Sequence, residues 1–119
     1  MGLLNATTAG ADQFIADHGH CLVEGEEVLV CFKTVRDWIV FSSWRIIYVD
    51  VQGLTGKKKE YLTIPYRSVN AYAIESAGTF DLDAEVKVYL SGHPPLEFKI
   101  GKDSDVSGLQ ILMAEKLDR

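Results

Sequence analysis

The feature that most constrains the fold is a series of short segments in which apolar and polar residues alternate. The alternation starts at Val28 and recurs as far as Ile100, and turn-forming residues separate the segments. A period of two places the apolar side chains on one face of a β-strand. Consecutive strands joined by such short connections pair as antiparallel hairpins. The sequence therefore predicts a mainly β, antiparallel domain.

Seven strands are expected from this pattern. They span residues 28–33, 38–41, 44–51, 60–64, 69–76, 85–90 and 96–100. Arg36-Asp37 is expected to form a tight turn, and Ser42-Ser43 the next one. Residues 92–95 are expected to form a turn before the last strand. Pro65 should end the fourth strand, because proline cannot donate a hydrogen bond to a neighbouring strand.

The period of the pattern changes after the last strand. A stripe of apolar residues recurs at about 100° per residue, which predicts an amphipathic helix. The stripe contains Val106, Leu109, Met113 and Leu117, with Leu112 at its edge. Asp103 or Ser104 can cap the helix, and Ile111 falls on its opposite face. Such a helix can cover the apolar mouth of a strongly bent antiparallel sheet.

The first 25 residues differ from the rest, because they are small and polar. Asp12 to His18 is expected to form a short helix that ends at Gly19. Thr7, Thr8 or Asp12 are the candidate caps of this helix. We therefore expect an N-terminal arm or short helix over residues 1–25 and a domain over residues 26–119.

Size and composition limit the functional classes. The chain has 119 residues, which suits one domain, and a formal net charge of -5, which disfavours nucleic acid as a partner. Two cysteines do not form a disulfide framework. A signal peptide and a membrane-spanning run are not evident in the sequence. We expect a cytoplasmic protein with free thiols.

The strand order and several motifs resemble one known family. The motifs are Arg36-Asp37, Val40-Phe41-Ser42, Arg45-Ile46-Ile47, Asp50-Val51-Gln52-Gly53-Leu54-Thr55-Gly56-Lys57-Lys58, Glu60-Tyr61, residues 64–68 and residues 77–85. Together they resemble the bacterial PH domain family, a group of uncharacterised bacterial proteins, over residues 24–117. The resemblance implies a pleckstrin-homology-like sheet or barrel of about seven strands capped by the C-terminal helix.

The resemblance also implies a type of function. Members of this family have no settled ligand and tend to form homo-oligomers, some of which are rings. Two residues depart from the family pattern: Trp44 stands before Arg45 in place of a basic residue, and Val51 stands in place of a lysine. Both departures remove positive charge, which weakens an anion-binding interpretation.

Lys57, Lys58 and Lys59 are the candidate anion-binding residues, for a lipid headgroup or another phosphate ligand. The alternative is a solvated loop tip, which we favour. The glycines before these lysines do not have the spacing of a phosphate-binding P-loop. The connection at Arg36-Asp37 is also too short for the basic cradle of eukaryotic PH domains. A membrane lipid is therefore a less favoured partner.

Two further clusters could hold a metal ion. His18, His20 and Cys21 could ligate zinc, but a fourth ligand is not apparent. Asp81, Asp83 and Glu85 alternate like calcium ligands, but Val86 stands where an EF-hand loop needs glycine. The alternative for the acidic cluster is an outward face that leads into a strand. We expect no metal, no cofactor and no catalytic residues.

Trp38, Trp44 and Ile111 are the candidate residues of an oligomer interface. Exposed tryptophans on neighbouring strands would form an aromatic patch of the kind enriched in interfaces. The alternative is that one or both tryptophans fill the core. The sequence thus favours a non-enzymatic interaction module that self-associates, with binding of an anionic lipid or phosphate ligand as the alternative.

Overall fold

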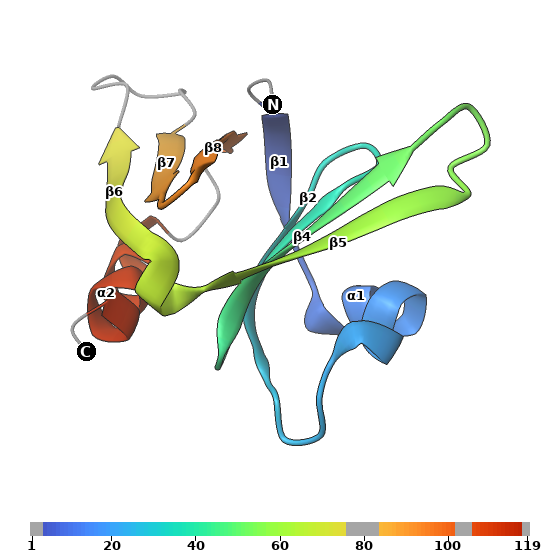
Figure 1. The fold of residues 1–119 in the computed structure, drawn as a ribbon, viewed down its shortest axis with the longest axis horizontal. Coiled ribbons are helices and arrows are strands. Elements are labelled where there is room, and N and C mark those ends of the chain that lie inside the picture. The colour runs from blue at the N-terminus through green and yellow to red at the C-terminus, as the bar shows by residue number, and fades with distance from the viewer. Residues whose placement is uncertain (1–3, 76–83, 102–105, 118–119) are drawn as a thin grey trace. The chain divides into compact units, whose positions relative to one another are not determined.

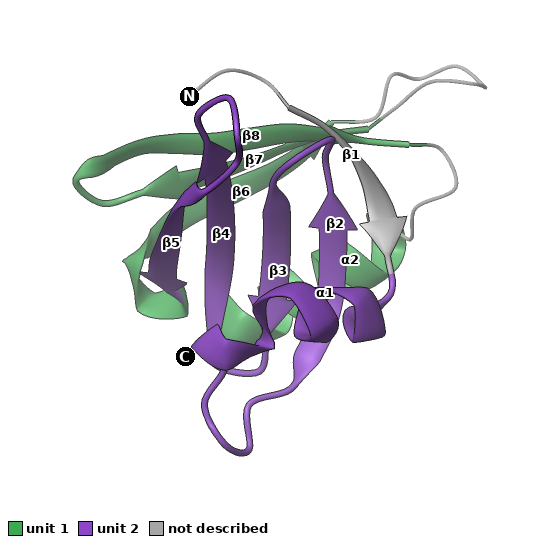
Figure 2. Ribbon diagram, turned by 90° about the vertical axis from the view of Figure 1, so that its right-hand side faces the viewer, with its two compact units in different colours: residues 1–7, 66–119 green, residues 8–65 purple. Residues whose placement is uncertain are grey.

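The structure, a computed structural model, describes residues 4–75, 84–101 and 106–117. The chain divides into two compact units, one formed by residues 8–65 and the other by residues 1–7 together with residues 66–119 (Figure 2). Each unit contains one antiparallel sheet and one α-helix.

The unit of residues 8–65 starts with a short helical segment and continues as a four-stranded meander (Figure 1). Helix α1, Ala11–His18, leads into the 3₁₀ turn η1, Gly19–Cys21. The strands are β2, Val28–Lys33; β3, Trp38–Ser42; β4, Arg45–Gln52; and β5, Lys58–Pro65. Each strand pairs antiparallel with the next one along the chain.

Helix α1 lies against one face of this sheet (Figure 2). Phe14 of α1 is completely buried there. The cluster around it contains Cys31, Trp38, Val40, Ile47 and Val49, with Cys21, Leu22, Val28, Val51 and Tyr61 at its margin. Because Cys31, Val40 and Ile47 are direct cross-strand neighbours, one row of small and branched side chains forms the surface on which Phe14 packs.

The opposite face of the same sheet is buried as well. Phe32, Ile39 and Tyr48 are cross-strand neighbours on this face, and all three side chains are buried. The simple alternation expected for β2 is interrupted by a register shift between Val28 and Val30, so Cys31 joins the core cluster. Strand β3 is therefore buried on both faces, as its continuous apolar sequence allows.

The second unit consists of a three-stranded antiparallel meander and the C-terminal helix. The 3₁₀ turn η2, Tyr66–Ser68, precedes β6, Val69–Glu75; β7, Ala84–Leu90; and β8, His93–Ile100. Helix α2 spans Val106–Leu117. Strand β1, Leu4–Ala9, pairs in parallel with β8 through Leu4 to Ala6.

Helix α2 packs beside β6 and η2 (Figure 1). Leu109 and Met113 are its buried residues, as the helical stripe predicts. The Tyr72 hydroxyl donates to the Gln110 carbonyl at 3.3 Å, which fastens the helix to β6. Ile111 is 59% exposed on the opposite face, in agreement with the sequence pattern.

The prediction of seven antiparallel strands followed by a helix is confirmed, and three local expectations are wrong. Strand β1 was not predicted, and it contains Thr7 and Thr8. These threonines therefore do not cap α1: its N-cap is Gly10, which makes no side-chain hydrogen bond. The turn before β8 is Ser91-Gly92, and Pro94 and Pro95 lie inside the strand. A register shift between Val88 and Leu90 explains why these prolines are tolerated, because an irregular ladder does not require their missing N–H groups.

The helix expected from Asp12 to His18 is confirmed: it begins one residue earlier, at Ala11, and it ends at Gly19 as expected. The expected caps of α2, Asp103 and Ser104, lie outside the described residues. The division at residue 25 between an arm and a domain stays a prediction.

Phe14 provides a test of how α1 is held. We expect Phe14→Ala to lower the free energy of unfolding by about 3–5 kcal/mol, because the substitution removes a buried aromatic ring and leaves a cavity. The neighbouring Ile15 is 49% exposed, so Ile15→Ala should cost less than about 1 kcal/mol. Urea unfolding followed by circular dichroism measures both values. Equal losses in the two variants would contradict the packing described here.

Candidate functional site

The loop with three lysines joins β4 to β5. Gln52 and Lys58 are the last paired residues of this hairpin. Gly53 and Gly56 have φ values of +80° and +70°, a conformation that other residues adopt only with strain. The two glycines therefore serve the backbone of the turn, as the sequence indicated.

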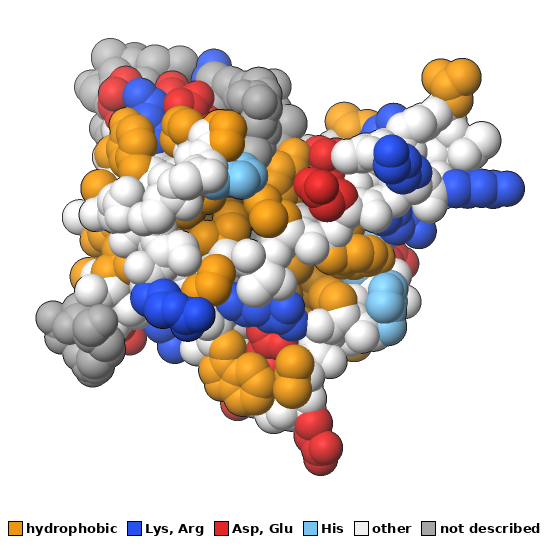
Figure 3. Space-filling model, viewed as in Figure 1, with side chains coloured by type: hydrophobic (Ala, Val, Ile, Leu, Met, Phe, Trp, Pro, Cys, Tyr) orange, Lys and Arg blue, Asp and Glu red, His pale blue; other side chains and the backbone are white. Residues whose placement is uncertain are grey.

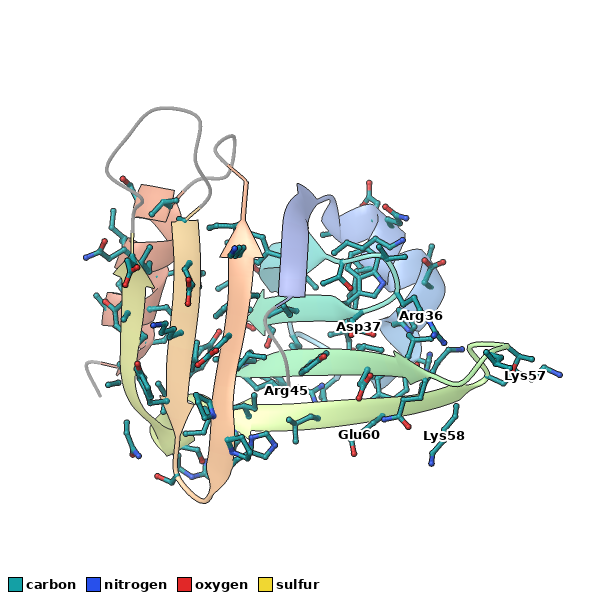
Figure 4. The ribbon with its side chains drawn as sticks, turned by 90° about the horizontal axis from the view of Figure 1, so that it is seen from above. Arg36, Asp37, Arg45, Lys57, Lys58 and Glu60 are labelled. Carbon is teal, nitrogen blue, oxygen red and sulfur yellow. The ribbon has the colours of Figure 1, made fainter. Side chains whose placement is uncertain are left out.

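The three lysines are exposed but do not share one face. Figure 4 shows Lys57 and Lys58 extending away from the hairpin. Lys58 and Lys59 are consecutive residues of β5, so their side chains point to opposite faces of the sheet. Lys59 shares the face of Tyr61, where α1 packs, whereas Lys58 shares the face of Glu60. The structure thus divides the predicted triplet.

The two faces of this hairpin differ in charge. Glu60 is the cross-strand neighbour of Asp50, and both lie on the face of Tyr48. Burial, together with the charges of Asp37, Asp50 and Glu60, raises the pKa of Tyr48. On the other face the nearby groups are mainly basic: Lys33, Lys59 and His20 all help to lower the pKa of His18, after the larger effect of burial.

The turn at residues 34–37 is fastened to the lysine loop. The Arg36 guanidinium donates a hydrogen bond to the Gly53 carbonyl. The Asp37 carboxylate accepts one from the Val51 amide at 2.9 Å and one from the Tyr48 hydroxyl at 3.1 Å. Figure 4 shows Arg36 and Asp37 side by side at this end of the sheet. Arg36 and Asp37 therefore hold two loops together within the protein.

Arg45 forms a second network at the other end of the same sheet. Its Nε and Nη2 atoms donate to the Glu26 carboxylate at 2.8 and 2.9 Å. Its guanidinium also donates to the Cys21 carbonyl at 2.7 Å and to the Thr63 hydroxyl at 2.8 Å. Sequence reasoning missed Glu26, because the loop that contains it has no periodic pattern.

The Glu26 side chain is fully buried in this network. The Ser42 hydroxyl donates to Glu26 Oε2, the oxygen that also accepts from Arg45 Nε. The hydrogen bonds from Arg45, opposed by burial, lower the pKa of Glu26 to about 2 and raise the pKa of Arg45. The pair is therefore charged over the whole range above about pH 4.5, and it fixes the loop of residues 21–27 to the β3–β4 turn.

Trp44 lies on the β3–β4 turn and is 52% exposed. Its backbone amide donates to Ser42 Oγ at 3.1 Å, and the Ser43 amide donates to the Glu27 carbonyl at 2.8 Å. Val23 is also exposed, and its amide donates to Glu26. In Figure 3, exposed hydrophobic side chains lie together at the bottom of the view, where Figure 1 draws the loops of this unit.

Trp38 is 1% exposed, so it belongs to the core cluster and is unavailable to a partner in this structure. The Trp38 ring makes an edge contact with the Phe14 ring, and the two ring centroids are 5.4 Å apart. The sequence left open whether Trp38 is exposed or fills the core, and the structure places it in the core. The candidate interface of Trp38, Trp44 and Ile111 is therefore corrected to Trp44 and Ile111.

The residues considered as zinc ligands have other partners. His18 is 6% exposed, and its Nδ1 atom lies 2.9 Å from the Tyr61 hydroxyl oxygen. The His20 ring contacts the edge of the Tyr61 ring. In the described part of the chain, no three His, Cys, Asp or Glu side chains come together as metal ligands would. The core position of His18 could have been found from its spacing of four residues from Phe14.

The remaining candidates are the acidic residues near β7 and the two cysteines. Asp81 and Asp83 lie outside the described residues, and Glu85 lies 3.6 Å from Lys87 Nζ. Burial raises the pKa of both cysteine thiols, Cys21 and Cys31. A raised pKa keeps a thiol protonated and makes it a poor nucleophile.

Comparisons with known proteins agree with the resemblance seen in the sequence. The family model described as "Bacterial PH domain" matches residues 1–117. The chain is 44% identical to the uncharacterized protein YjqA of Bacillus subtilis (strain 168) over 116 residues, which cover 95% of this chain and 93% of that protein.

Two solved structures are similar to most of the chain. One is a DUF1696 family protein with a pleckstrin-homology domain from Shewanella loihica PV-4, with 36% identity, a TM-score of 0.80, and coverage of 98% of this chain and 99% of that one. The other is a pleckstrin homology domain from Shewanella amazonensis SB2B, with 40% identity, a TM-score of 0.66, and coverage of 92% and 89%. These matches confirm the predicted PH-like fold.

Acid titration tests the Arg45–Glu26 network. The pKa of Glu26 falls from 4.5 to about 2 on folding, so the pair contributes up to about 3 kcal/mol above pH 4.5. This contribution is lost as the pH falls from 4.5 toward 2. We therefore expect Glu26→Gln to cost about 3 kcal/mol at pH 7 and progressively less below pH 4.5, in urea unfolding from pH 7 to pH 3.

The exposed neighbour Glu24 supplies the control for this titration. Glu24→Gln should leave the free energy of unfolding within about 0.5 kcal/mol of the unmodified protein at each pH. A gap between Glu26→Gln and the unmodified protein that stays constant down to pH 3 would refute the assigned pairing.

Proposed function

Because this chain belongs to the bacterial PH domain family, we propose that it is a non-enzymatic interaction module that self-associates. The family fold presents loops and strand ends on a rigid sheet, and PH-like domains typically act as modules without catalytic activity. The relatives are named as an uncharacterized protein and a protein with a pleckstrin-homology domain, names that include no ligand or reaction.

One observation supports this proposal most directly: an exposed tryptophan is held on a rigid turn. The Trp44 backbone is fixed through Ser42, which also binds the Arg45 amide and Glu26. A residue whose backbone is already fixed loses less conformational freedom when a partner covers its side chain. Tryptophan is also one of the residue types enriched at interface hot spots. Trp44 is therefore the favoured centre of a contact between copies.

The groups with shifted pKa values also favour a structural role over catalysis. Three of them have a partner within the same unit: Glu26 has Arg45, Tyr48 has Asp37, and His18 has Tyr61. Catalytic groups with shifted pKa values are instead directed at a cleft where a substrate can bind.

Binding of a phosphate-bearing ligand is the second candidate function. The observation that favours it is the joining of two loops by Arg36 and Gly53, which brings Lys57 to Lys59 close to the turn at residues 34–37. The division of the lysines between two faces, one of them acidic, makes this function the weaker candidate.

A cytoplasmic location is part of the same proposal. Of the helices in the described ranges, none has the length and apolar character to cross a membrane. The formal net charge of -5 would also repel an anionic bilayer at long range.

Light scattering after size exclusion tests self-association. We expect the unmodified protein to exceed the 13.2 kDa of one chain at micromolar concentration. Trp44→Ser should weaken the assembly about 30-fold or more, because loss of a hot-spot side chain costs about 2 kcal/mol. Ile111→Ser tests the second surface in the same way.

Leu54→Ser is the matched control, because Leu54 is a fully exposed apolar residue at the tip of the β4–β5 loop. This variant should assemble like the unmodified protein. A strict monomer at micromolar concentration would overturn the proposal of self-association. Unchanged assembly of Trp44→Ser would overturn the role of Trp44 alone.

Co-sedimentation with vesicles tests the second candidate. A phosphate-ligand function predicts that vesicles containing anionic phospholipid retain the protein and that changing all of Lys57 to Lys59 to Ala reduces retention about tenfold. Competition by inorganic phosphate distinguishes recognition of a simple phosphate from recognition of a lipid surface. Equal retention of both proteins would exclude this loop as the binding site.

A further inference from the structure

The contact between α1 and its sheet is built around a buried histidine. His18 occupies the last turn of α1 and is almost completely buried. Its ring centroid lies 5.8 Å from Phe14, 6.4 Å from Trp38 and 5.7 Å from Tyr61. Its Nδ1 atom shares a hydrogen bond with the Tyr61 hydroxyl. The imidazole thus sits among three aromatic rings with one polar contact.

The surroundings of His18 favour the neutral ring. Lys33 of β2, Lys59 of β5 and His20 of η1 oppose a positive charge there, and among the charged groups of the described ranges Asp17 of α1 favours it. The other titratable groups in the cluster are the hydroxyl of Tyr61 and the thiols of Cys21 and Cys31. Burial, with the net effect of these charges, places the pKa of His18 below its ordinary value of 6.5.

Helix α1 has few means of staying folded without this contact. It has eight residues, its N-cap is Gly10, and no side chain caps its first turn. Phe14 and His18 are its only buried residues. Isolated helices of this length are marginal in water, so α1 depends on these two side chains for its position. A positively charged imidazolium at His18 would be costly unless water could hydrate it. The ring becomes accessible to water when the helix leaves the sheet.

We propose that α1 is a pH-sensitive cover, which detaches from the sheet when His18 takes up a proton and so uncovers Trp38 and Tyr61. The closed form is fully favoured above pH 6.5 and weakens as the pH falls toward the lowered pKa of His18. This weakening begins below pH 6.5, whereas Glu26 loses its contribution only below pH 4.5, so the cover begins to open before the sheet loses that ion pair. The uncovered face is apolar and aromatic, which is the chemistry of a protein-binding surface.

Hydrogen exchange of the full chain at pH 7.5 and pH 5.5, corrected for intrinsic exchange rates, tests this proposal. Each pH unit below 6.5 can favour the open form by up to about tenfold. We expect amides of residues 11–21 to lose protection about tenfold at pH 5.5, while those of β7 and β8 keep theirs. In a Trp44→Phe background, quenching of Trp38 fluorescence by acrylamide should increase over the same range.

Three variants identify the titrating group. His18→Phe and His18→Leu cannot be protonated, so both should keep α1 protected at pH 5.5, and circular dichroism confirms that each is folded. His20→Gln is the matched control and should open like the unmodified protein, because the His20 side chain is exposed.

The possible results are clearly separated. Unchanged protection of residues 11–21 at pH 5.5 in the unmodified protein overturns the proposal. The same loss in the folded His18 variants also overturns it, since another group would then be titrating. Loss of protection throughout β2–β5 and β7–β8 overturns it as well, because the event would be global unfolding.

Discussion

The unit of residues 8–65 depends on one buried ion pair. Arg45 connects three separate segments: the loop at Glu26, the η1 turn through the Cys21 carbonyl, and β5 through Thr63. Transferring a charged group from water into the protein interior is costly. A buried ion pair therefore stabilises a fold only when its remaining donors and acceptors are also hydrogen-bonded. Here Ser42 and the Val23 amide complete the bonds of the Glu26 carboxylate. Because these bonds fix both the loop and the β3–β4 turn, they decide where Trp44 is displayed.

The same reasoning changes how the family motifs are interpreted. Arg36, Asp37 and Arg45 are charged residues in the segments that resemble bacterial PH domains, and charged residues in loops usually suggest a ligand site. In this structure their bonds lead to Gly53, Val51, Tyr48 and Glu26, all within one unit. These residues therefore explain the resemblance in fold without a ligand, and they leave the exposed aromatic side chain of Trp44 as the more informative surface feature.

The sequence was sufficient for most of the fold, and the reasons for its failures are physical. Alternation located seven strands and the helical period located α2, because burial imposes these periods directly. Helix α1 was located by its candidate caps and its end at Gly19. Strand β1 was missed, because its small polar residues have no periodicity and it is defined by pairing with the distant β8. The pattern alone could not show which of Trp38 and Trp44 is buried, since the apolar run of a strand that is buried on both faces does not show which side is covered. Glu26 was missed, because its role depends on Arg45, which lies 19 residues further along the chain.

The position of the lysine run on the sheet has a consequence for solubility. Strand β5 is the last in the order of the described strands, so one side of it offers backbone N–H and C=O groups to any other strand that approaches. Charged residues, especially lysine, and proline are the features by which natural edge strands resist pairing between molecules. Lys58, Lys59 and Glu60 occupy one end of β5 and Pro65 the other, so the neutral stretch between them is only Tyr61 to Ile64. The lysines thus protect an open sheet edge from aggregation, a role that needs no ligand.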